Sequence, residues 1–119
     1  MKILNFKNDD TVIITGSSRR GYINTTYADL VHTFGDPTYT TDDKVTAEDD
    51  KVTAEWTLEF LIEYNDAPGS VMREVVIATI YDWKQQTTPH EPYDWHIGGY
   101  GYNLAIECVY QALNDNGVT

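Results

Sequence analysis

The tripeptide Tyr-Asp-Trp occurs twice, at residues 81–83 and 93–95, and it holds the carboxylates best placed for chemistry. Asp82 and Asp94 each stand between two large rings, which could shield a carboxylate from water and tune it as a general acid or base. A hydrolase using either aspartate is therefore one hypothesis. Such an aspartate is more often a strand residue that points to solvent, so the sequence favours a protein that is not an enzyme.

Histidine and cysteine offer little for a metal or a nucleophile. The three histidines and the one cysteine are scattered, and no pair has the spacing typical of metal ligands. Cys108 falls on the apolar stripe of a predicted helix, where a thiol is a small buried hydrophobe rather than a nucleophile. We expect neither a metal nor another cofactor.

The rings of the two tripeptides suit a planar ligand better. They share one parity along two predicted strands, opposite to the two aspartates: Tyr81, Trp83, Tyr93 and Trp95. If the strands pair, the rings should gather on one face and offer a stacking platform. At its rim, polar contacts could come from Lys84, His96 and the backbone amides of Gly98 and Gly99. The same rings could equally form an ordinary core, and the sequence leaves both interpretations open.

A second candidate element is the small-residue loop at residues 16–23, which contains Arg19 and Arg20. Hydroxyl groups, exposed amides and guanidinium forks are what a phosphate group needs. These are two of the three arginines in the chain. The alternative is a surface turn with solvated arginines.

Composition limits the classes that fit. A chain of 119 residues with 41% hydrophobic residues is expected to be one globular domain spanning 1–119. The net charge of −11 argues against direct nucleic-acid binding, although it permits an acidic mimic of nucleic acid. The single cysteine favours a reducing cytoplasm, and no segment is typical of a membrane span.

Hydrophobic periodicity predicts an α+β domain with a mostly antiparallel sheet and two helices packed on it. A hairpin is expected from the runs at 3–6 and 11–15, and a helix at 24–35 begins with Thr26 and Asp29 as a capping box. The remaining expected elements are strands at 52–64, 71–84 and 93–97, a turn at 65–70, a loop at 85–92, a glycine turn at 98–101 and a helix at 103–114.

Residues 42–55 are an exact tandem copy of the heptapeptide Asp-Asp-Lys-Val-Thr-Ala-Glu. Seven is an odd number, so both copies cannot continue one strand with the same face buried. We assign the second copy to the strand that follows, and the first to an extended loop or acidic flap.

The order of several segments resembles a family of small phage proteins. These segments are Gly-Ser-Ser-Arg-Arg-Gly-Tyr-Ile, Thr-Thr-Tyr-Ala-Asp-Leu-Val-His-Thr-Phe-Gly-Asp-Pro-Thr, Val-Thr-Ala-Glu-Trp, Ala-Thr-Ile-Tyr-Asp-Trp-Lys and Trp-His-Ile-Gly-Gly, followed by a final helix. In this layout the chain is similar to the Thoeris anti-defence family of the first type, whose members sequester cyclic nucleotide-like immune signals without destroying them. The resemblance implies a homo-oligomer with ligand between protomers, and points to Arg19, Arg20, Trp83, Lys84 and His96.

Two non-enzymatic hypotheses follow. The first is a phage anti-defence protein, working in the cytoplasm of the host bacterium, that binds a cyclic nucleotide-type signal without cleaving it. The alternative is an acidic inhibitor that binds a host defence nuclease or another protein directly, using the carboxylates of residues 42–55.

Overall fold

The computed structural model describes residues 1–9, 11–12, 18–40, 52–85, 87–99 and 104–117. Over these residues the strands form one six-stranded sheet. Five of them have the order β1-β4-β5-β6-β2, and the sixth, β3, pairs with the first residues of β4, before the stretch of β4 that pairs with β1. The elements, in chain order, are β1 Lys2–Asn8, β2 Ser18–Thr25, α1 Tyr27–Phe34, β3 Tyr39–Thr40, β4 Ala54–Ala67, β5 Ser70–Tyr81, β6 Tyr93–Gly99 and α2 Leu104–Asp115.

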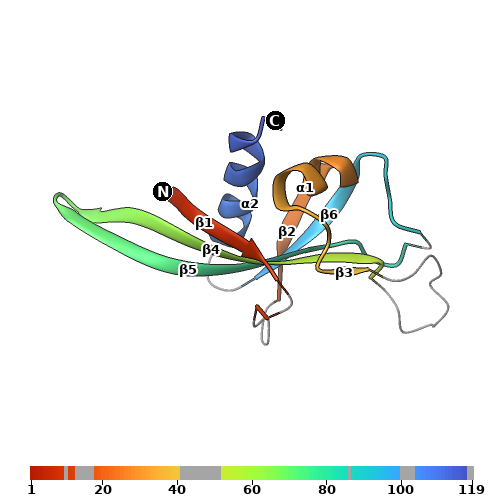
Figure 1. Cartoon of the computed structure of the whole chain (residues 1–119), viewed down its shortest axis with the longest axis horizontal. Coiled ribbons are helices and arrows are strands. Elements are labelled where there is room, and N and C mark those ends of the chain that lie inside the picture. The colour runs from red at the N-terminus through yellow and green to blue at the C-terminus, as the bar shows by residue number, and fades with distance from the viewer. Residues whose placement is uncertain (10, 13–17, 41–51, 86, 100–103, 118–119) are drawn as a thin grey trace.

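Every strand pair is antiparallel, and both helices lie on the same face of the sheet (Figure 1). The predicted α+β class with a mostly antiparallel sheet is therefore confirmed. The other face carries no helix in the described part of the chain, and we call it the helix-free face. The turn end of the β4–β5 hairpin projects past the helices (Figure 1).

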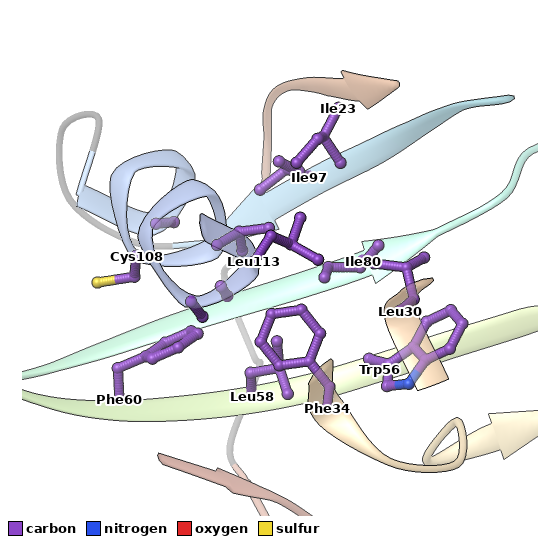
Figure 2. Close-up of a cluster of buried hydrophobic side chains, with 14 of the residues drawn as sticks. Ile23, Leu30, Phe34, Trp56, Leu58, Phe60, Ile80, Ile97, Cys108 and Leu113 are labelled. Atoms are coloured by element: carbon purple, nitrogen blue, oxygen red, sulfur yellow. The ribbon is translucent and has the colours of Figure 1, made fainter. Parts of the chain in front are cut away.

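The core lies between the helices and the sheet (Figure 2). Alternation along β4 is the reason, because every second side chain points toward the helices: Trp56, Leu58, Phe60 and Ile62 are all buried. From α2, Cys108 and Leu113 complete this layer, so the predicted burial of Cys108 is confirmed.

Local signals set the ends of α1. The side chain of Thr26 accepts a hydrogen bond from the Asp29 amide at 3.1 Å, as the capping-box pattern predicts. Gly35 ends the helix at a φ of 86°, in the left-handed region that favours glycine. Leu30 and Phe34 are buried and His32 is exposed, as expected from helical spacing.

Three predicted segments are wrong. The run at 3–6 lies in β1, which pairs with β4, and Thr11 and Val12 lie in a turn rather than in a second strand; 13–15 are outside the described residues. Residues 18–23, predicted as loop, belong to β2, because Tyr22 and Ile23 pair with β6. Gly98 and Gly99, predicted as a turn, are the last residues of β6.

The tandem copy lies mostly outside the described residues. Residues 42–51 cover the first copy and the start of the second, so the acidic flap is not described. The second copy leads into β4 at Ala54 and Glu55, as the parity argument predicts.

Candidate functional site

A row of large polar and aromatic side chains crosses the helix-free face from strand to strand. The register pairs Tyr39 with Glu55, Glu55 with Tyr81, Tyr81 with His96, and His96 with Tyr22. These five residues come from β3, β4, β5, β6 and β2 in turn, and we call them the cross-sheet row. Directly opposite residues on one face have Cβ atoms about 5 Å apart, so the side chains of the row are neighbours.

His96 is the centre of the ring contacts in this row. The ring of Tyr81 stacks on it with a centroid distance of 5.2 Å and an interplanar angle of 23°. From the other side Tyr22 meets the imidazole edge-on at 4.8 Å. The helix-free face therefore carries a continuous patch of rings, with Tyr22 and Tyr39 each 45% exposed.

Trp83 extends the patch beyond the end of β5. Its indole lies 6.5 Å from the Tyr81 ring and 6.4 Å from the imidazole of His96. The hydroxyl of Tyr93 accepts a hydrogen bond from the Trp83 amide at 3.2 Å, which holds the backbone there. With 40% of its side chain exposed, Trp83 offers a surface on which a flat ligand could stack.

The predicted platform of four rings on one face is wrong. Trp95 points to the opposite face, where it is fully buried and packs edge-on against Trp56 at 5.5 Å and against Tyr93 at 5.3 Å. The reason is the register, because Tyr81 pairs with His96 and not with Trp95. The structure brings together Tyr81, Trp83 and His96, and assigns Trp95 to the core.

Asp82 is fully buried and has a structural partner at each carboxylate oxygen. It accepts hydrogen bonds from the amides of Thr53 at 2.7 Å and Ala54 at 3.1 Å, and from the Thr53 hydroxyl. The same hydroxyl lies 2.8 Å from that of Thr88. Asp82 thus joins the start of β4, the end of β5 and the following loop. The prediction that it points to solvent is wrong.

The other groups proposed for chemistry lie apart from one another. Asp94 is exposed and accepts a hydrogen bond from the Asn24 side chain at 2.9 Å. Burial, and to a lesser degree the charge of Glu107, raises the pKa of Cys108 to about 12, so its thiol stays protonated at neutral pH. In the described part of the chain, no three His, Cys, Asp or Glu side chains are grouped as metal ligands.

The two arginines lie on β2, and the structure describes their backbone but not their side chains. Arg19 pairs with Gly98, and Ser18 pairs with Gly99. β6 has strands on both sides, so its two glycines carry their amides within the sheet rather than at an open phosphate-binding turn. Gly98 is next to His96 on the helix-free face, which places the backbone of Arg19 beside the cross-sheet row.

Lys84 and His90 complete the predicted polar residues of this region. Lys84 is exposed and has a φ of 56° just beyond Trp83. His90 packs its ring 4.8 Å from that of Tyr27, on the helix side of the sheet and away from the row.

Sequence reasoning missed three members of the row: Tyr22, Tyr39 and Glu55. Tyr22 was expected in a loop, and β3 is only two residues long. The hairpin turn at Pro68-Gly69 shows that β4 and β5 pair, but it does not place Glu55 opposite Tyr81, because the register shifts by one residue between Asn65 and Ala67.

A scan against protein-family models, a search of curated proteins and a search of solved structures found no match for this chain. None of the helices in the described residues has the length and apolar character needed to span a membrane.

Proposed function

We propose that this protein binds a small nucleotide-derived ligand on the cross-sheet row and holds it without cleaving it. The observation that carries the proposal is the set of ring contacts around His96, extended by the exposed indole of Trp83. Stacking on aromatic side chains is a general way to hold a base, and contributes about 1–3 kcal/mol per base. The resemblance given above favours a cyclic nucleotide-type immune signal, which would make the chain a phage anti-defence protein of the host cytoplasm.

Phosphates would be held at the β2 side of the row. Arg19 and Arg20 are the cations nearest to it along the chain, and Lys84 follows Trp83. Capture without cleavage is supported by the positions of the two aspartates, because Asp82 caps backbone amides inside the fold and Asp94 is bound to Asn24. Asp82 therefore lies away from the row, whereas Asp94 is on the helix-free face two residues before His96, where the Asn24 side chain already holds its carboxylate.

Association of several copies is part of the proposal. The projecting β4–β5 hairpin exposes apolar side chains that one copy leaves uncovered: Val71 is 59% exposed, Met72 42% and Val75 54%. Apolar surface of this kind is typical of contacts between subunits. Light scattering on the purified protein would measure the number of copies directly.

The test of binding is mass spectrometry on cyclic nucleotides and cyclic ADP-ribose isomers incubated with the protein. The free fraction and the fraction released by heating are analysed separately. A nucleotide that is depleted from the free pool and returned intact by heating is the expected result. A nucleotide returned chemically altered would instead show an enzyme, and a panel with no depletion would remove the proposal.

Two matched variants assign the site. Trp83→Ala removes an exposed ring from the patch and should weaken capture at least about tenfold. Tyr110→Ala removes a ring that is 50% exposed on α2 and whose hydroxyl donates a 3.4 Å hydrogen bond to the backbone carbonyl of Tyr22, not to a ring of the patch, so capture should stay close to that of wild type. Equal losses in both variants would place the ligand elsewhere.

A further inference from the structure

The part of β5 nearest the hairpin turn has a neighbouring strand on one side only. β4 pairs with β5 from Ser70 to Tyr81, whereas β6 pairs with it only from Ala78 to Tyr81. Among the described residues, no strand pairs with the outer edge of β5 from Ser70 to Ile77. An open edge of this length is a template on which another strand can pair.

The close contact at Gly99 shows which backbone groups point to that edge. A Cβ atom on Gly99 would lie 2.4 Å from the carbonyl oxygen of Ile77, so this carbonyl is directed toward β6. The N–H and C=O groups of one residue point to the same side of a strand, and the side alternates from residue to residue. Val71, Arg73 and Val75 therefore direct their amides and carbonyls to the open edge, away from β4.

Two of these three residues also expose apolar side chains on the helix-free face. Val71 is 59% exposed and Val75 is 54% exposed, one on each side of Arg73. The Arg73 side chain lies 3.2 Å from the carboxylate of Glu63, which is opposite it on β4. The edge is therefore apolar at two positions, and the charge between them is already balanced.

We propose that this open edge of β5 pairs antiparallel with the same edge of a second copy, across a two-fold axis at Arg73. Val71 of each copy then lies opposite Val75 of the other, so the exposed valines cover one another. In this register the outward amides and carbonyls of all three residues meet partners. The inference rests on the association of copies proposed above and names its surface, and it does not depend on nucleotide binding.

The neighbouring registers are less favourable. An axis at Glu74 would set two carboxylates opposite each other, and no ion pair of Glu74 lies in the described part of the chain to compensate them. An axis at Met72 would leave the valines without apolar partners. An axis at Val75 would set residues of the second copy against the stretch after Ile77, where β6 already pairs. At Arg73, by contrast, each guanidinium group brings its own carboxylate.

Two lysine variants of the intact protein test the contact, with the association constant measured by sedimentation over a range of concentrations. Val75→Lys places a charge against Val71 of the other copy and should weaken association at least about tenfold. Met72→Lys is the matched control, because Met72 is also exposed, at 42%, but the register sets it opposite Glu74 of the other copy. It should leave association unchanged or strengthen it. Equal losses in both variants would show an unspecific apolar contact and overturn the pairing.

Disulfide formation tests the register itself. The Cα atoms of a hydrogen-bonded antiparallel pair are about 5.5 Å apart, which a disulfide can span. Val71→Cys and Val75→Cys proteins should therefore crosslink when they are mixed but not when each is alone, and the native Cys108 is buried. No crosslink in the mixture, or an equal crosslink within one variant, would overturn the register.

The wild-type chain separates this inference from the proposed function. If it stays monomeric at every concentration, the proposed association and this pairing both fail, whereas the mass spectrometry test decides nucleotide capture independently. If it associates but the valine variants do not crosslink as described, association stands and the β5 pairing is wrong.

Discussion

Asp82 shows how a residue that resembles a catalytic acid can have a structural role. Its carboxylate is fully buried and accepts two backbone hydrogen bonds at the start of β4. In Asp82→Asn one acceptor becomes a donor that faces other donors, so we expect a loss of about 2–4 kcal/mol in the free energy of unfolding. Urea denaturation measures it. Asp94→Asn, at an exposed position, should change stability by less than about 0.5 kcal/mol. Similar small effects in both would contradict the structural role of Asp82.

Glu55 gives a dependence of stability on pH with a defined sign. Burial raises its pKa in the folded state above the ordinary value of 4.5, so the folded protein binds more protons than the unfolded chain between the two values. The contribution of Glu55 to stability is therefore largest below pH 4.5 and decreases as pH rises through the folded pKa.

Glu55→Gln removes this titration. Relative to wild type, the variant should gain stability as pH increases from about 4 to about 7, and the difference should level off above the folded pKa. Urea denaturation of both proteins at several pH values measures the difference. A difference that is constant with pH, or that favours wild type as pH rises, would show that burial does not raise the pKa of this carboxyl.

At the scale of elements, β5 and α2 pack so closely around the end of β6 that a side chain at Gly99 would clash with both. Gly99 at the end of β6 has a φ of 156°, and a Cβ atom there would lie 2.4 Å from the carbonyl oxygen of Ile77 and 2.7 Å from the Cβ of Ala105. Neither atom can move without shifting β5 or α2. Gly99→Ala should therefore cost about 3 kcal/mol, measured by thermal unfolding.

Gly21 on β2 is the matched control. A Cβ atom there would lie 2.8 Å from the Cδ1 atom of Ile106, the flexible end of a side chain that can rotate away. Gly21→Ala should therefore cost less than about 1 kcal/mol. The opposite order of the two costs would show that the contact between α2 and the sheet is looser than described.

Elements marked by local signals could be predicted from the sequence. The capping box of α1, the alternation along β4 and the helical spacing of α2 depend on residues close in the chain, and all three are confirmed. The site could be predicted only in part, because parity along one strand does not say which face meets the next strand. A shift of one residue places His96, and not Trp95, opposite Tyr81. The pairing of β5 with β6 decides which residue lies opposite Tyr81, and no local pattern in the sequence predicts that register.

The whole molecule is strongly acidic, and this affects how a phosphate-bearing ligand approaches. Its net charge is −11, and its principal extents are 54 × 31 × 21 Å. At about 10 mM salt the screening length is about 30 Å, so an approaching anion is repelled by charges on all sides of the protein. At about 150 mM salt the length is about 8 Å, and the ligand senses only the residues around the cross-sheet row. Screening should therefore help encounter rather than hinder it.

We expect the association rate constant of a captured cyclic nucleotide to rise severalfold between about 10 and about 150 mM NaCl. Stopped-flow quenching of tryptophan fluorescence measures it, because Trp83 is exposed whereas Trp56 and Trp95 are buried. The dissociation rate constant should rise as well, since salt weakens contacts between arginines and phosphates once the ligand is bound. Changing Arg19 and Arg20 together to Ala should weaken binding without unfolding the protein. It should also remove the rise in dissociation rate but leave the rise in association rate. An association rate that falls with salt would mean that the local cations outweigh the acidic field of the whole protein.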